Sequence, residues 1–282
     1  MEAEALCTRL DRDFDLAHCR DDWSRMSFTN YYTDNFRQHY MGLMLDYARE
    51  FHQVFTAVFP SAAVLDRLLE MDARDCLLVL HHPMHWDIRN KPSPFIAIDE
   101  SRLDALRNQR ISLYVMHTPL DRSGPYSTTN TLAAALDIDK TGDFCEYFGW
   151  PCGVIGTTTC RTTGQLARTA AATVAHRVRI WPYGDDLIDD GRLALIAGGG
   201  NDPDVYPQLA ALDIHTFVTG ITARNEHSQA AHDLARKHRI NLIGLTHYSS
   251  EKFACIALCE YFARPGLPCL FLPDEPVLED MG

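Results

Sequence analysis

Three short segments of the sequence carry histidines and carboxylates directly after apolar runs. They are HHPMHW (81–86), HTPLD (117–121) and THYSSE (246–251). Bound groups in open α/β sheets collect at the carboxyl ends of the strands, so segments in this position can meet at one site. Imidazoles and carboxylates without thiolates suit zinc, manganese or iron, and the sequence therefore indicates a metal centre.

The first segment places two histidines side by side. In an extended chain, adjacent side chains point to opposite sides, so His81 and His82 face one cavity only if the backbone turns. Pro83 favours such a turn. The alternative is that both are ordinary polar residues at the end of a strand, one of them buried and the other solvated.

The other two segments also allow a purely structural interpretation. Asp121, four residues after His117, could cap the turn that follows it. Glu251, four residues after His247, falls in the first turn of a helix if a preceding serine caps that helix. The helix dipole would then stabilise the carboxylate without any metal.

Taken together, the three segments supply more ligands than one metal ion needs. The candidate ligands are His81, His82, Asp121, His247 and Glu251. A catalytic zinc takes about three protein ligands, whereas two ions that share a bridging carboxylate would use the whole set. Ion pairs of this kind lie about 3.5–4 Å apart and activate a water molecule or hold a phosphate.

Other motifs give weaker signals. The AGGGN segment (197–201) lacks both the Lys-Ser/Thr of a P-loop and the G-x-G-x-x-G spacing, so we interpret it as a tight turn. HSQAAH (227–232) is not an H-E-x-x-H motif, and we interpret it as the surface of a helix. No G-x-S-x-G segment and no activating context for a cysteine supports a nucleophilic triad.

Alternating strands and helices must position these segments. Near-continuous apolar runs are typical of buried parallel strands, and they occur at 76–82, 111–117, 193–200, 215–220 and 240–247. Helical patterns lie between these runs. The alternation predicts an α/β fold with mainly parallel sheets and flanking helices.

The chain is long enough for one large domain or two small ones. We predict an N-terminal extension at 1–45 and an α/β domain at 46–282, with lobes at roughly 46–147 and 160–282. FGWPCGVIGTTT (148–159) contains glycine and proline, and we interpret it as a connection between the lobes.

The composition limits the classes of partner. The 282 residues carry a formal net charge of −12, which argues against duplex nucleic acid because phosphate binding needs clustered Lys and Arg. Nine scattered cysteines, an odd number, do not form a disulfide framework. The N-terminus lacks an apolar signal core, and no apolar run is long enough for a bilayer. We therefore expect a cytoplasmic protein without a membrane anchor.

The order of the motifs resembles that of the NIF-three-like dinuclear metal-centre family, whose members are known as type 2 GTP cyclohydrolase I homologues. The likeness covers roughly 50–260 and rests on HHPMHW, on HTPLD followed by NTLAAAL, on AGGG after a strand, on VTG and on INLIGLTHYSSE.

The resemblance implies that the five candidate ligands match the metal ligands of the family, and that His117 matches a histidine near them. It also implies an α/β fold of two similar lobes with the metal site in the cleft between them, and a ring-shaped homohexamer. Ring-opening hydrolysis of a purine nucleotide is the activity that it suggests.

We therefore predict a dinuclear, metal-dependent hydrolase for a nucleotide or another phosphorylated small molecule, with two divalent ions (zinc, iron or manganese). His117 and Glu251 are the candidates for moving protons. Two alternatives stay open. A chaperone for a metal or metallo-cofactor would use the same ligands but release the metal to an acceptor, and a regulatory scaffold would retain the site as structure.

Overall fold

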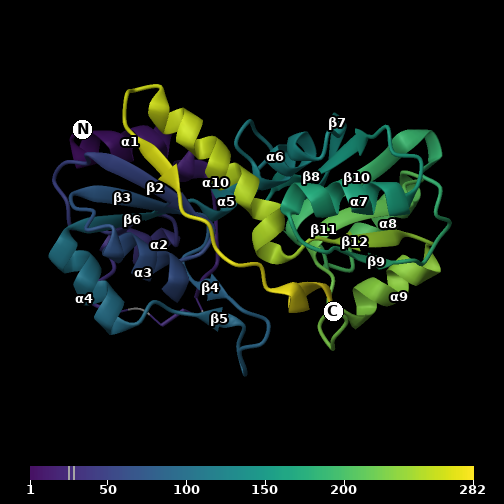
Figure 1. Cartoon of the computed structure of the whole chain (residues 1–282), viewed down its shortest axis with the longest axis horizontal. Helices are drawn as coiled ribbons and strands as arrows, with labels where there is room; N and C mark the ends of the chain where they lie inside the picture. Colours follow the sequence, from purple (N-terminus) through teal and green to yellow (C-terminus); the bar gives the residue numbers. More distant parts are fainter. Residues whose placement is uncertain (25, 28) are drawn as a thin grey trace. The chain divides into compact units, whose positions relative to one another are not determined.

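The computed structural model describes residues 1–24, 26–27 and 29–282, and the chain divides into two compact units (Figure 1). Unit 1 comprises Met1–Leu120 and Cys255–Asp274, and unit 2 comprises Asp121–Ala254 and Glu275–Gly282. Each unit has its own sheet and its own buried apolar clusters. Helix α10 (His247–Ala263) contributes its first half to unit 2 and the remainder to unit 1.

The sheet of unit 1 has five strands. Their order is β1 (Gly42–Leu45), β6 (Ile111–Val115), β3 (Cys76–Leu80), β2 (Gln53–Ala57) and β13 (Cys269–Phe271). Every pairing is parallel except that of β1 with β6. All residues of β3 and β6 are buried, as expected for strands that are covered on both faces.

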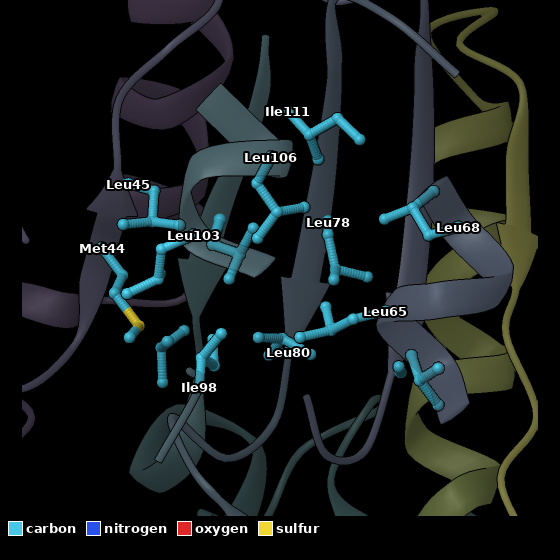
Figure 2. Packing of buried hydrophobic residues seen from close by; sticks show 14 of the residues in the cluster. Met44, Leu45, Leu65, Leu68, Leu78, Leu80, Ile98, Leu103, Leu106 and Ile111 are labelled. Carbon is cyan, nitrogen blue, oxygen red and sulfur yellow. The ribbon is translucent and has the colours of Figure 1, made fainter. Parts of the chain in front are cut away.

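Helices cover both faces of this sheet. The helices of unit 1 are α1 (Ala3–Asp13), a 3-10 turn (Leu16–His18), α2 (Asp34–His39), α3 (Ala62–Glu70), α4 (Glu100–Gln109) and most of α5 (His117–Asp121). Figure 2 shows the leucines of α3 and α4 lying over Leu78 and Leu80 of β3. On the other side, the Thr56 hydroxyl of β2 donates to the Cys255 carbonyl of α10 at 2.7 Å. A short hairpin of β4 (His85–Trp86) and β5 (Phe95–Ile96) follows β3.

Unit 2 contains a six-stranded mixed sheet. The order is β7 (Asp139–Tyr147), β8 (Trp150–Thr157), β10 (Arg192–Gly199), β11 (Thr216–Ile221), β12 (Asn241–Gly244) and β9 (Arg179–Trp181). β11 pairs in parallel with β10 on one side and with β12 on the other. The pairings of β7 with β8, β8 with β10 and β12 with β9 are antiparallel. The helices are α6 (Thr128–Ala135), α7 (Thr163–Val174), α8 (Val205–Ala211) and α9 (Gln229–Lys237), with 3-10 turns at Asp189–Gly191 and Leu278–Met281.

The predicted α/β class is confirmed, and the apolar runs identified in the sequence are the parallel strands of the two sheets. The interpretation of 148–159 as a connection is wrong, because most of it forms β8, which pairs with both β7 and β10. Its glycines make room for cross-strand partners: a Cβ at Gly153 would overlap the Phe144 ring, and one at Gly156 would overlap Ile138. Among the described residues, no helix has the length and apolar character needed to cross a bilayer.

Candidate metal centre

Unit 1 brings three histidines together at the carboxyl ends of two neighbouring strands of its sheet. His81 and His82 follow β3, and His117 begins α5 shortly after β6. The two strands are parallel neighbours with Leu80 opposite Val115, so their carboxyl ends coincide. The ring centroids of His81 and His82 lie 4.3 Å apart. The ring centroid of His117 lies 5.0 Å from that of His81 and 4.6 Å from that of His82.

All three rings are buried, and each offers a nitrogen within 4.8 Å of those of the other two. The backbone explains how adjacent residues share one side. The N–H groups of His81 and His82 donate to the carbonyls of Ala57 and Val58, at 3.1 and 2.9 Å, where the chain leaves the strand. Phe59 then stacks on His82 with ring centroids 4.7 Å apart.

The N-terminal segment also contacts this cluster, which the sequence did not predict. Asp21 Oδ2 lies 2.9 Å from His117 Nδ1. Burial raises the pKa of the Asp21 carboxyl, but the electrostatic attraction of the neighbouring His117 imidazole and its hydrogen bond outweigh that effect, so the pKa lies below its usual range. Trp23 presents its ring edgewise to His82 and His117.

Unit 2 supplies a histidine and a carboxylate from one helix. His247 and Glu251 lie four residues apart in α10 and therefore share a face of the helix. His247 Nε2 is 3.2 Å from Glu251 Oε1, and both side chains are buried.

The start of α10 differs from the serine-capped helix considered in the sequence. The helix begins at His247, whose N–H donates to Asp280 Oδ2 at 2.9 Å. The Thr246 hydroxyl oxygen accepts the N–H of Ser249 at 3.2 Å. Glu251 thus lies beyond the first turn, where the helix dipole stabilises a carboxylate less. Thr246 has φ = +79°, a conformation that costs a β-branched residue energy and that clusters at functional sites.

The AGGG segment lies against these two side chains. Gly198 has φ = +73°, and a Cβ on it would lie closer than 3.0 Å to Glu251 Oε1 and 3.4 Å from His247 Nε2. Its N–H donates to the Ser250 hydroxyl oxygen at 2.8 Å, and that hydroxyl donates to the His247 carbonyl at 2.8 Å. A glycine is required here for space as well as for backbone conformation. The interpretation of AGGGN as a simple turn missed this contact.

Asp121 is the last residue of α5 and does not cap the following helix. Ser127 caps α6 by accepting the N–H of Asn130 at 3.1 Å. The carboxylate of Asp121 instead accepts the hydroxyl of Thr128 at 3.3 Å. Ser127, and not Asp121, therefore caps α6.

The prediction that HSQAAH is a helix surface is wrong for His232. This residue lies on the buried face of α9 with Ala231 and Ala235. Its Nδ1 accepts the Tyr183 hydroxyl at 2.8 Å, and its Nε2 donates to the Thr222 carbonyl at 3.1 Å.

The donors of each unit are of the types that bind transition metals. Unit 1 offers three imidazoles, and unit 2 offers one imidazole and the carboxylates of Asp121 and Glu251. Mixed nitrogen and oxygen donors are those that zinc, iron and manganese take in proteins. His81 Nδ1 lies 3.4 Å from the Met116 carbonyl, and such a contact leaves Nε2 as the nitrogen for a metal.

Comparisons with known proteins are consistent with these motifs. A family model described as Duf34/NIF3 (NGG1p interacting factor 3) matches residues 34–273. A relative from Treponema pallidum (strain Nichols), named GTP cyclohydrolase 1 type 2 homolog, is 27% identical over 256 residues, which cover 78% of this chain and 85% of the relative. A Vibrio cholerae protein of the same name is 28% identical over 243 residues, covering 84% and 90%.

Solved structures share the fold. The protein ybgI, described as being of unknown function, superimposes with a TM-score of 0.74 at 22% identity, covering 98% of this chain and all of its own. A protein from Thermus thermophilus, TTHA1606, gives 0.70 at 24% identity, covering 98% and 99%.

Proposed function

The chain belongs to the Duf34/NIF3 family, and from that premise we propose that it is a metal-dependent hydrolase for a nucleotide or another phosphorylated small molecule. In this proposal it binds two divalent transition-metal ions, zinc, iron or manganese. The ligands are His81, His82, Asp121, His247 and Glu251.

The burial of so many titratable side chains at strand and helix ends is the observation that carries the proposal. Polar groups removed from water are costly unless they are paired or bind a ligand. His81 is fully buried, and His82, His247 and Glu251 are no more than 7% exposed. Thr246, with φ = +79°, holds the backbone before His247 in a conformation that costs energy for a residue with a Cβ and therefore needs a compensating benefit.

The chemistry follows from the ligand types. Divalent ions of this class lower the pKa of a bound water towards neutrality and so supply a nucleophile. The carboxylate of Glu251 would help to hold the metal ions. His117 lies beside His81 and His82, where its imidazole can accept or return a proton.

A purine nucleotide is the first substrate class to test, because the relatives are named GTP cyclohydrolase 1 type 2 homolog. The formal net charge of −12 argues against duplex nucleic acid but does not exclude a small phosphorylated substrate, because metal ions can supply local positive charge. Assembly into a homohexamer and a cytoplasmic location remain predictions. Light scattering on the purified protein tests the assembly.

Elemental analysis of the purified protein, together with a screen of nucleotides and phosphate esters, tests the function. We expect about two transition-metal ions per chain after loading. His247→Ala and Glu251→Ala should each lower the metal content and abolish hydrolysis, while the chain stays folded because a core of this size does not need the metal.

His227→Ala is the matched control, because this histidine is 82% exposed and belongs to the same unit as His247. It should keep the metal content of the parent. The proposal fails if His247→Ala and Glu251→Ala bind as much metal as the parent, or if His227→Ala loses as much as they do.

A further inference from the structure

The family match begins at residue 34, yet a segment before it lies against the site histidines. The Thr118 hydroxyl donates to the Arg20 carbonyl at 2.7 Å, which ties the segment to the residue after His117. Asp21 then meets His117, and the Trp23 ring lies 5.1 Å from that of His117 and 6.0 Å from that of His82. Residues 20–23 therefore form part of the wall of the histidine cluster in unit 1.

We infer that Asp21 is a positioning residue of this centre, which holds His117 in the tautomer that carries its proton on Nδ1. The consequence is that Nε2 keeps its lone pair and is available to a metal ion or to a proton. The inference deepens the proposed function and rests on it for the role of His117, but the tautomer itself can be measured independently.

The burial and the hydrogen bonds of the Asp21 carboxylate suit this role. Its side chain is only 2% exposed, and burying a carboxylate is costly unless both of its oxygens are engaged. Oδ1 accepts the backbone N–H of Asp22 at 2.8 Å, and Oδ2 faces His117 Nδ1 at 2.9 Å. A carboxylate has no proton to donate, so the hydrogen on this contact must belong to the imidazole.

Such carboxylate–histidine pairs recur where an imidazole serves a metal or transfers a proton. The carboxylate fixes the ring orientation and the tautomer and raises the basicity of the other nitrogen. Trp23 adds a second restraint, since its edgewise contacts with the His82 and His117 rings limit their rotation and exclude water.

The substitution Asp21→Asn tests the inference, because the fixed N–H of Asp22 orients the new amide. If the amide oxygen accepts that N–H, the amide nitrogen faces His117 and donates to Nδ1. The proton of His117 must then move to Nε2, which removes the lone pair from the metal side. The change in volume is minimal, so tethering of the segment is retained.

Histidine side-chain NMR of the ¹⁵N-labelled, metal-free protein reads out the tautomer, with His117→Gln identifying the His117 signals. We expect Nδ1–H in the parent and a shift towards Nε2–H in Asp21→Asn. Zinc affinity, measured by competition with a chromophoric chelator, should fall about 10- to 100-fold in the variant if Nε2 of His117 binds the metal in addition to the five proposed ligands, and should stay parental if Nε2 only transfers protons.

Asp15→Asn is the matched control. Asp15 makes the same kind of contact with His18, at 2.6 Å, but both side chains are exposed and belong to the same N-terminal segment. This variant should leave the His117 tautomer and the zinc affinity unchanged.

An Nε2–H tautomer of His117 in the parent overturns the inference, and this measurement does not require Asp21→Asn to fold. A parental tautomer and parental zinc affinity in Asp21→Asn also overturn it. If the parent binds no zinc but the tautomer still depends on Asp21, the positioning role stands and the proposed function fails.

Discussion

Replacement of Gly198 by alanine should weaken metal binding much more than it lowers the stability of the fold. An alanine Cβ would lie closer than 3.0 Å to Glu251 Oε1, whereas ordinary contact begins at 3.4 Å. The carboxylate must therefore retreat by roughly 1 Å, and a misplacement of that size in a site can cost about 100-fold in function. The φ of +73° adds about 1–2 kcal/mol for any residue with a Cβ.

We expect Gly198→Ala to fold, to lose a few degrees in Tm, and to bind zinc about 10- to 100-fold more weakly than the parent. Titration with a chromophoric chelator and a thermal melt of the metal-free protein measure the two effects separately. The clash involves the end of a long side chain, which can move without disrupting the core, so the affinity should suffer more than the stability.

Gly149→Ala is the control that isolates the backbone cost. Gly149 has φ = +83° in the β7–β8 hairpin, and a Cβ there meets nothing within 4 Å. Its Tm should fall by a similar amount with no change in zinc affinity. Equal zinc affinities for Gly198→Ala and Gly149→Ala would refute the argument that Gly198 makes room for Glu251.

Two further predictions concern stability alone. His232→Ala should lower the free energy of unfolding by about 1–3 kcal/mol in a denaturant melt, because it leaves the Tyr183 hydroxyl and the Thr222 carbonyl without their buried partner. Elemental analysis of the same variant should show the metal content of the parent. The hydrogen bond from the Ser101 hydroxyl is the largest of the contacts that lower the pKa of Asp99 to about 2. A carboxyl with a lowered pKa stabilises the fold above its ordinary pKa of 3.8 and loses that effect as the pH falls through about 2. Asp99→Asn should therefore lower the Tm at pH 7, and melts at decreasing pH should show the difference vanishing near pH 2.

The parts of the centre that follow from local pattern could be predicted from the sequence. The runs before His81 and His117 are almost entirely apolar, which marks them as buried strands whose ends lie together in a parallel sheet. The run before THYSSE likewise places His247 and Glu251 near the end of a strand, but His247 is the first residue of α10 rather than the last of the strand, so the two side chains share one helix face. These inferences need only the periodicity of strands and helices.

The missed parts depend on contacts between distant residues. Asp21 lies 96 residues from His117 in sequence, and nothing in the acidic N-terminal segment distinguishes this carboxylate from its neighbours. The role of Gly198 depends on a positive φ and on a close approach to Glu251, neither of which a glycine run reveals. The burial of His232 follows from its position on the face of α9 that it shares with Ala231 and Ala235, and the HSQAAH motif does not reveal this face.

The position of β13 bears on how the chain folds. This strand pairs with β2 at the edge of the unit 1 sheet, although it is synthesised long after β2, once all the strands of unit 2 have been made. Until then β2 is an uncovered edge, with the unpaired backbone groups of Val54 and Thr56 available to other chains. The nascent protein thus passes through a stage in which unit 2 can close its core while unit 1 still presents an open strand, and the order of synthesis makes that strand the point at which aggregation competes with folding.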